Sequence, residues 1–542
     1  MKHRLSRFSC VFFVAMVAGW LTCPSSAWGY AVGAALSLEK LAEESDLIFK
    51  GTVLSDAPVE DDWFKPLPSF GPRETRFKVI SVIKGGSPGD TVRFRHYDFD
   101  QGGGGYMYMP LYYHFEDKAT CIVFAKKTDA AGVFRQFSEH HTARERQGVL
   151  NCASESPVTG KNLKEVIWNE LTSMLKDGGA VHPTYAIGQL DEMSLENDDF
   201  NSTRDFNRTE VLRAVRSSLK SEFPQVVEAA LTLVGSQNPY MREDRAGHWL
   251  AAVGSAPSPN LAAMNAQMKN TGGVMCREDL CAIADGKRSE GTRALAIRAL
   301  GLVREPSLRE NLRHWLADPQ PAVRAAAAVL LSDFPGTETN GALTMLDADV
   351  SADVRSAVAR AIAFSQKKEL LSILVGLLRD SNEYVRRCAC QGLLSFSTKD
   401  VKVAHAFEDA LAIKEFDPLF LTALARDNPA KYLDGLARVI KDQPQPENWS
   451  GGTIPAYAAW KILFEYVTTQ PPEAIKSGKL NASLDALEHT GQYSSSEPRD
   501  LYAFFLRTGL RERAMAFRAK AVKAVSYDLD YYFKQVDGEP PK

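Results

Sequence analysis

Two hydrophobic periodicities divide the chain near residue 155. From residue 46 to residue 137, apolar and polar residues alternate in short runs that are rich in β-branched side chains and end at Gly or Pro, a pattern typical of strands. After residue 160 the apolar positions recur about every 3.6 residues, the period of an amphipathic helix. The pattern therefore predicts a multidomain chain, with a small β domain followed by an all-α region.

The β region is predicted to hold one helix and five strands. The helix is expected over residues 36–44, ahead of the first strand. The predicted strands cover residues 46–54, 75–85, 90–95, 120–126 and 133–137. Short strands with polar turns are the pattern of a small β-barrel, which we expect over residues 30–155.

A short motif recurs at a fixed interval in the helical region. Each of three segments begins with Asp and places a Val-Arg pair after four further residues, and the arginines are 31 residues apart. The three pairs are Asp318 with Arg324, Asp349 with Arg355, and Asp380 with Arg386. A fourth copy is headed by Arg293, with Lys287 in place of the Asp. A constant interval of this length predicts stacked helical repeats, which are regular over residues 291–397.

The remainder of the helical region is predicted to be less regular. Residues 156–207 form a linker that contains one helix, helical repeats extend over residues 208–440, and residues 441–542 form a C-terminal helical cap. Terminal units of a repeat array have to cover its last apolar face, so a departure from the motif is expected there.

The helical region resembles the HEAT-repeat family in its short bacterial form, through the Asp-x4-Val-Arg motif and its interval. The resemblance implies an α-solenoid. It also implies that the turn Asp and the helix Arg of the three motifs form a hydrogen-bonded ladder between repeats, with Arg293 left without an Asp partner at Lys287. A row of arginines that binds an anionic ligand is the alternative for the same residues.

The β region resembles the netrin-like domain, a barrel of the oligomer-binding (OB) type that tissue inhibitors of metalloproteinases share. The resemblance lies in the runs SDLIFKGTV (residues 45–53) and FKVISVIKG (residues 77–85). It implies inhibition of a secreted hydrolase as one function. Those inhibitors chelate the zinc of the target through an N-terminal cysteine, and this chain has no cysteine between Cys23 and Cys121, which does not fit that mode.

The first 29 residues have the three regions of a secretory signal. A basic start precedes an apolar stretch of 11 residues from Val11 to Leu21, and small residues lead to Gly29, the expected cleavage point. The stretch is shorter than the roughly 18–20 residues of a membrane-spanning helix. We therefore expect export to the periplasm or the medium, with no membrane insertion after the signal is cleaved.

The charge balance bears on the partner. The chain has 64 Lys and Arg against 67 Asp and Glu, and residues 1–29 hold three of the basic ones, which leaves 61 against 67. No basic stripe or tail remains, whereas nucleic acids and anionic membranes require clustered positive charge. We therefore expect a protein partner and no nucleic acid.

Six cysteines follow residue 29, and an exported chain with an even number of cysteines can hold disulfides. Cys276 and Cys281 flank a predicted short turn and are the expected pair, with Cys121 and Cys152 as the second candidate pair. The remaining two, Cys388 and Cys390, are expected to be buried apolar residues of a helix.

Residues 102–115 form the candidate binding loop. Four successive glycines are flanked by aromatic residues, and the candidate binding residues are Tyr106, Tyr108, Tyr112 and Tyr113. Loops on a rigid barrel often carry recognition, and Tyr supplies amphipathic contact area. The alternative is that these aromatic residues pack the barrel against the helical region.

Catalytic and metal-binding chemistry has little sequence support. His140 and His141 are the candidate metal ligands, although neighbouring histidines diverge on a strand or helix and no third ligand stands at metal-site spacing. No hydrolase, metalloprotease, dinucleotide or phosphate-loop motif occurs in the sequence, so no cofactor is expected.

The sequence as a whole predicts a non-enzymatic protein-binding or scaffolding module. One alternative is a hydrolase inhibitor that acts through the barrel and residues 102–115. The other is an enzyme with a site at the junction of barrel and solenoid, which requires a pocket with converging titratable residues.

Overall fold

The computed structural model describes residues 37–64, 70–99, 111–136, 148–194, 204–236, 270–334, 336–442, 454–489, 496–524 and 529–538. They divide into two compact units. The first holds the described residues of Gly29–Arg242 and Met268–Leu330, and the second holds those of Leu331–Lys542. Among the described residues, no helix combines the length and the apolar character that crossing a membrane requires.

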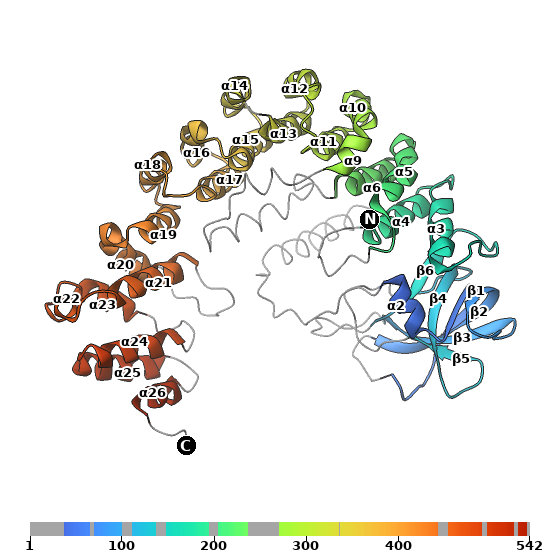
Figure 1. Ribbon diagram of the computed structural model, residues 1–542, viewed down its shortest axis with the longest axis horizontal. Helices are drawn as coiled ribbons and strands as arrows, with labels where there is room; N and C mark the ends of the chain where they lie inside the picture. The colour runs from blue at the N-terminus through green and yellow to red at the C-terminus, as the bar shows by residue number, and fades with distance from the viewer. Residues whose placement is uncertain are drawn as a thin grey trace, which may run out of the picture. The chain divides into compact units, whose positions relative to one another are not determined.

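The first unit begins with helix α2 (Leu38–Glu44) and a six-stranded sheet, drawn in blue and cyan in Figure 1. The strands are β1 (Leu47–Pro58), β2 (Phe70–Lys84), β3 (Thr91–Phe99), β4 (Thr120–Lys127), β5 (Val133–Arg135) and β6 (Val149–Cys152). Five of them lie where the alternation of apolar residues predicts them. The sixth, β6, has four residues, too few for an alternating pattern to be recognised.

Five of the six strands pair in a closed ring. β1 pairs with β2 and β4, β2 pairs with β3, and β5 pairs with β3 and β4, so these five strands form a closed circuit. The β3–β5 pair is parallel, whereas the other pairs are antiparallel. β6 pairs antiparallel with residues 120–123 of β4.

Both faces of β1 are buried, from Leu47 to Val53. One face joins a core of apolar residues contributed by all strands of the circuit, with Phe49 and Phe77 in edge contact at 5.5 Å between ring centroids. The other face meets helix α3, where the Lys50 ammonium lies 2.8 Å from the Glu170 carboxylate and is fully buried. The sheet and the first helices therefore pack as one unit.

Helices α3 and α11 of the first unit begin where the sequence supplies a capping side chain. Asn162 Oδ1 accepts the Glu165 N–H at 3.0 Å, and Ser289 Oγ accepts the Thr292 N–H at 3.2 Å, which satisfies first-turn donors. The helices are α3 (Leu163–Met174), α4 (Val181–Glu192), α5 (Arg208–Val215), η1 (Arg216–Lys220), α6 (Pro224–Gly235), α9 (Thr271–Met275), α10 (Arg277–Asp285), α11 (Glu290–Ala299), α12 (Leu308–Leu316) and α13 (Pro321–Leu330).

The described residues of the second unit are helical throughout, apart from turns. Its helices are η3 (Leu331–Asp333), α14 (Thr337–Leu346), α15 (Ala352–Ser365), η4 (Lys368–Leu370), α16 (Leu371–Leu377), α17 (Glu383–Leu394), α18 (Val401–Ala410), α19 (Asp417–Asp427), η5 (Pro429–Tyr432), α20 (Leu433–Asp442), α21 (Ile454–Thr468), α22 (Pro472–Lys476), α23 (Asn481–Leu487), α24 (Ser496–Arg507), α25 (Arg511–Ala524) and α26 (Leu529–Asp537).

Helices of the second unit alternate between two layers. In Figure 1, α14, α16 and α18 form one layer, and α15, α17 and α19 form the other. The residues three and seven positions after the motif arginine hold the stack together, because Val358, Ile362, Ala389 and Leu393 are completely buried. Small or branched side chains at these positions let neighbouring helices approach closely.

The expected disulfide between Cys276 and Cys281 is not formed. Both are free thiols, because the segment between them is helical rather than a turn: Cys276 precedes α10 and Cys281 lies within it. Five positions along a helix rotate a side chain by about 140°. Burial raises the pKa of both thiols to about 11.

The second candidate pair is also free. Cys121 faces Asn151 across the β4–β6 ladder, whereas Cys152 faces Thr120. Since neighbouring positions of a strand point to opposite faces, the Cys121 and Cys152 side chains lie on opposite sides of the sheet.

Candidate functional site

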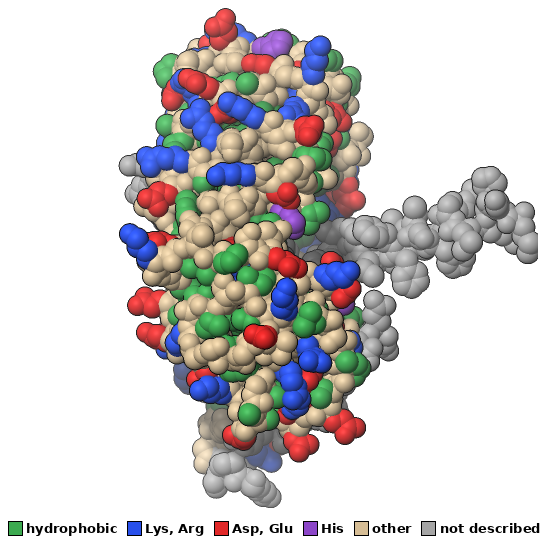
Figure 2. Space-filling model, turned by 90° about the vertical axis from the view of Figure 1, so that its right-hand side faces the viewer, with side chains coloured by type: hydrophobic (Ala, Val, Ile, Leu, Met, Phe, Trp, Pro, Cys, Tyr) green, Lys and Arg blue, Asp and Glu red, His purple; other side chains and the backbone are tan. Residues whose placement is uncertain are grey.

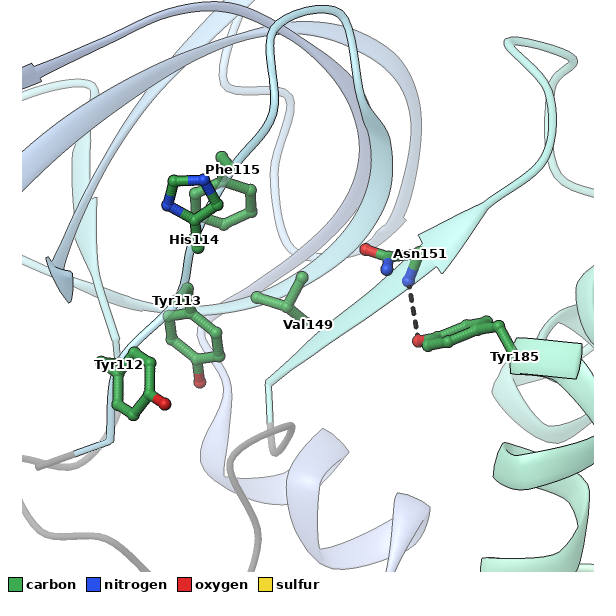
Figure 3. Close-up of a pocket in the computed structure, with 7 residues that line it drawn as sticks. All are labelled: Tyr112, Tyr113, His114, Phe115, Val149, Asn151 and Tyr185. Carbon is green, nitrogen blue, oxygen red and sulfur yellow. Dashed lines mark hydrogen bonds between the residues drawn. The ribbon is translucent and has the colours of Figure 1, made fainter. Parts of the chain in front are cut away.

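A cavity of about 240 Å³ lies in the first unit, between the sheet and helix α4. It is lined by Tyr112, Tyr113, His114, Phe115, Val149, Asn151 and Tyr185. In Figure 3 the residues from Tyr112 to Phe115 lie on one side, Asn151 and Tyr185 lie on the other, and Val149 lies between them. The volume is below the roughly 300–1,000 Å³ of small-molecule pockets, so the cavity suits one or two side chains of a partner.

The segment that carries Tyr112 and Tyr113 is fixed on strand β3. Tyr112 forms a parallel bridge with Tyr97, and the Tyr113 N–H donates to the Tyr97 carbonyl at 2.9 Å. The buried Gln136 reinforces this course, since its amide donates to the Leu111 carbonyl at 2.7 Å and accepts the Tyr97 N–H at 2.9 Å. One wall of the cavity is therefore rigidly positioned.

The polar groups of the lining are phenols, one imidazole and one amide. His114 Nδ1 lies 3.1 Å from Asp98 Oδ2, outside the cavity. On the opposite wall, the Asn151 backbone N–H donates to the Tyr185 hydroxyl at 3.1 Å. Burial raises the pKa of Tyr113 well above its ordinary value, so its phenol stays protonated. The lining supports hydrogen bonding and apolar contact more readily than proton transfer.

The structure brings two of the four predicted binding tyrosines to this cavity. Tyr112 and Tyr113 line it, whereas Tyr106 and Tyr108 lie outside the described residues. Tyr113 also belongs to the core of the sheet, so this side chain both packs the core and lines the cavity. Asn151 and Tyr185 were not predicted, because β6 is short and the α4 sequence contains Pro and Gly.

The predicted metal ligands, His140 and His141, lie outside the described residues. Within the part of the chain that the structure describes, no group of three or more His, Cys, Asp and Glu side chains is arranged to hold a metal ion. The metal-site hypothesis for the two histidines stays a prediction.

A buried polar network crosses the first three strands. Asp56 Oδ1 accepts the Thr75 hydroxyl at 2.6 Å, Asp56 Oδ2 accepts from the Arg73 guanidinium, and Thr75 Oγ1 lies 2.7 Å from His96 Nε2. Burial raises the pKa of Asp56, but the hydrogen bonds from His96, Thr75 and Arg73 outweigh it and lower the pKa from 3.8 to about 2. The carboxylate is therefore held ionised.

The lowered pKa of Asp56 predicts a pH-dependent effect of Asp56→Asn. The carboxylate stabilises the fold above the unfolded-state pKa of 3.8, and this stabilisation is lost as the pH falls towards about 2, because the folded state then binds the proton too. We expect Asn to cost on the order of 2 kcal/mol at pH 7, and the cost to shrink between about pH 4 and pH 2. Hydrogen exchange over β1, β2 and β3 across this range measures it, with Asp129→Asn, at an exposed position, as the control. A cost independent of pH would contradict the prediction.

The motif arginines connect successive repeats through carboxylates. In the first unit, Arg293 Nη2 donates to Asp318 Oδ2 at 2.6 Å. In the second unit, Arg355 makes two parallel hydrogen bonds to Asp380, at 2.6 Å and 2.8 Å. Both acceptors lie 25 residues after the arginine. Two-pronged pairing of this kind fixes orientation as well as distance.

Each motif aspartate also closes its own turn. Asp318 Oδ1 accepts the Gln320 N–H at 2.9 Å, and Asp380 Oδ1 accepts the Asn382 N–H at 2.8 Å, the pattern of an Asx turn. The arginine of the same motif adds a hydrogen bond to the turn backbone, as Arg324 does to the Asp318 carbonyl at 2.9 Å. One motif therefore stabilises both a turn and the contact to the preceding repeat.

The electrostatics follow from these contacts. The hydrogen bonds from Arg355 lower the pKa of Asp380 against the effect of burial. For Asp318, burial raises the pKa, but the hydrogen bonds from Arg293 and the Gln320 N–H outweigh it and lower the pKa overall. Because Arg293 and Arg355 each face a carboxylate, their charges are compensated, which favours the ladder over an anion-binding row.

One expectation about the ladder needs correction, and one contact was not predicted. Arg293 has a carboxylate partner although Lys287 replaces the Asp of its own motif, because the acceptor is Asp318 of the following repeat. The ladder also extends beyond the last motif, where Arg386 Nε donates to Glu415 Oε2 at 2.9 Å. Glu415 carries no motif and stands 29 residues after the arginine, so the fixed interval did not reveal it.

The architecture thus defines a sheet domain joined to stacked helical repeats. A sequence profile of the family described as HEAT repeats matches residues 278–348 and 339–419. These matches cover the ladder described above, so this part of the chain consists of HEAT repeats and forms a helical solenoid. The resemblance seen in the sequence is confirmed for this region.

Solved structures overlap with larger parts of the chain. An engineered protein is 15% identical, with coverage of 66% of this chain and 99% of that chain and a TM-score of 0.28. Kap121p bound to Pho4p is 13% identical, with coverage of 68% and 45% and a TM-score of 0.31. A chain of the Pds5–Scc1 complex is 10% identical, with coverage of 71% and 82% and a TM-score of 0.25.

TM-scores this low do not establish a shared overall fold, so nothing about this chain is inferred from these structures. The chain also spans less than half of the Kap121p chain, 45% of its length. No curated protein matches the sequence.

Proposed function

We propose that this chain is an exported, non-enzymatic protein-binding or scaffolding module. The observation that carries the proposal is the run of HEAT repeats over residues 278–419, with arginine–carboxylate pairs between repeats within each unit. Stacked helical repeats offer extended surfaces that suit protein partners. The ladder supports this use, because it keeps neighbouring repeats in register.

The sheet domain is proposed to be an OB-type barrel of the netrin-like kind. The closed circuit of β1, β2, β3, β5 and β4, with one parallel pair, supports this assignment. Export rests on the predicted signal over residues 1–29, which lies outside the described residues.

A protein partner is favoured by the surface charge. On the face shown in Figure 2, Lys and Arg side chains are interspersed with Asp and Glu side chains, with apolar side chains between them. A polyanion such as nucleic acid is bound best by clustered positive charge, whereas mixed charge and apolar area suit protein interfaces.

The cavity lining favours binding over catalysis. It offers one imidazole and three phenols, with the Asp98 carboxylate behind His114 rather than in the cavity. An acid–base enzyme needs converging titratable groups near the reacting atoms. The hydrolase-inhibitor alternative remains testable through the same experiment as the scaffold proposal.

Site-specific photo-crosslinking in the exported full-length chain tests the proposal. A photoreactive residue replaces Val350 or Val401 on the repeats, which are 94% and 69% exposed. The matched control replaces Leu54 of the sheet domain, which is 49% exposed. We expect defined protein adducts from the repeat positions. Adducts from Leu54 alone would contradict the scaffold proposal and favour an inhibitor that acts through the sheet domain.

A further inference from the structure

Among the described residues, strand β6 has one edge that pairs with no other strand, and it lies beside the cavity. β6 pairs with β4, and no other strand among the described residues pairs with it. The Phe124 N–H donates to the Gly148 carbonyl at 2.7 Å. In an antiparallel ladder the hydrogen-bonded positions alternate, so the backbone groups of Leu150 face β4, and those of Val149 and Asn151 face away from it.

The Asn151 contact confirms this direction. Its N–H points away from β4 and donates to the Tyr185 hydroxyl at 3.1 Å, as the dashed line in Figure 3 shows. A hydroxyl oxygen of helix α4 thus occupies the position at which the carbonyl of an adjacent strand would accept this N–H. Tyr185 caps the edge with a single atom that an incoming backbone carbonyl can replace.

The cavity beside this edge accepts side chains. Its far wall is the fixed segment that carries Tyr112 and Phe115, and aromatic walls suit apolar side chains of a bound peptide. At about 240 Å³ the space is too small for a typical cofactor but sufficient for one or two side chains. An extended peptide fits both the strand edge and the cavity, because its backbone groups can pair with the edge while its alternate side chains enter a pocket.

We propose that the β6 edge binds an extended segment of a partner protein, which adds to the sheet as a strand and places an apolar side chain between Tyr112 and Tyr185. The proposal is independent of the function assigned to the HEAT repeats. The occupant is a peptide in β conformation, since only an extended backbone offers donors and acceptors at the spacing of Val149 and Asn151.

A random dodecapeptide library on phage, selected against the full-length mature chain, provides the probe. The enriched peptide is synthesised and its affinity is measured by fluorescence anisotropy. N-methylation of its backbone, one residue at a time, is expected to weaken binding at every second residue, because alternate N–H groups of an added strand face β6. Uniform tolerance of N-methylation, or loss at positions with a helical period, would overturn the proposal.

Two variants of the protein are expected to shift the affinity in opposite directions. Tyr185→Phe removes the hydroxyl that competes for the Asn151 N–H and keeps the ring, so the peptide should bind about three- to tenfold more tightly. Val149→Pro removes an N–H that β4 does not use, which strand edges tolerate, so binding should weaken about tenfold or more. Weaker binding to Tyr185→Phe, or unchanged binding to both variants, would contradict strand addition.

The N-methylation series uses the unaltered protein, so a folding defect of either variant leaves the proposal testable. A library that yields no peptide specific for the mature chain would also overturn it. If the enriched peptide copies residues 100–110 or 137–147 of this chain, the edge is occupied by its own sequence, and the partner assignment is wrong.

Discussion

Replacement of Lys50 by Met is expected to destabilise the first unit by about 3–5 kcal/mol. The Lys50 side chain is fully buried, and its ammonium lies 2.8 Å from the carboxylate of Glu170, which is 10% exposed. Removal of the ammonium leaves a buried carboxylate without its partner, and an unpaired charge in a low-dielectric interior is far more costly than a broken surface pair.

Hydrogen exchange measured by mass spectrometry over α3 reports this loss. The chain contains two compact units, so a single two-state unfolding free energy is not defined for it, whereas exchange reads the local opening of one helix. The amides of α3 should exchange about 10²- to 10⁴-fold faster in Lys50→Met than in the unaltered chain.

The control and the double variant separate the charge from the packing. Lys78 lies on β2 and is exposed, so Lys78→Met should change α3 exchange little. In the double variant Lys50→Met with Glu170→Leu, no unpaired charge remains, and most of the stability should return. Exchange as fast in the double variant as in Lys50→Met would show that the ion pair is not the cause.

Lys50 also shows that a pattern of apolar and polar residues can predict a strand without predicting the burial of its polar residues. The alternation around it correctly predicts a strand, because strand formation depends on neighbouring residues. It does not distinguish a solvated lysine from a buried one, since that depends on α3, which packs on the outer face of β1. The partner, Glu170, lies 120 residues further along the chain.

The repeats were easier to predict than the cavity. Their motif recurs at a fixed interval, and each copy forms local turn contacts before any contact to the next repeat. Even so, the hydrogen-bond acceptor of Arg293 could not be predicted from its own motif. The acceptor is Asp318, the aspartate of the following motif.

The cavity depends on elements that have weak sequence signals. Tyr185 comes from α4, whose Pro183 and Gly188 argue against a helix when propensity alone is considered. Pro183 is tolerated because it stands at the third position of the helix, where the backbone N–H has no intrahelical acceptor in any case. Asn151 belongs to the four-residue β6. The wall formed by these two residues therefore could not be derived from the sequence.

Replacement of Arg355 by Ala is expected to destabilise the second unit by about 2–3 kcal/mol. The guanidinium is 15% exposed and makes two hydrogen bonds to the Asp380 carboxylate, which is 8% exposed. It also donates to the Asp349 carbonyl at 2.7 Å. The substitution removes these hydrogen bonds and leaves a largely buried carboxylate without its guanidinium partner. Hydrogen exchange over α15 and α17 measures the loss.

Arg387 provides a matched control, because it pairs with Glu383 at the same 2.6 Å but with both side chains more than 60% exposed. Solvent screening makes such a pair worth about 0–1 kcal/mol, so Arg387→Ala should leave exchange nearly unchanged. Equal effects of the two substitutions would show that burial of the ladder contributes nothing.

Asp380→Asn completes the test of the ladder. In the unaltered chain the Asn382 N–H donates to Asp380 Oδ1 at 2.8 Å. The side-chain oxygen of an asparagine at position 380 can accept the same hydrogen bond, so the turn is preserved while the charge is removed. Combined with Arg355→Ala, it should add little further destabilisation, because the pair is already broken. Fully additive effects would mean that the two residues act separately, and that the turns rather than the ladder hold the repeats in register.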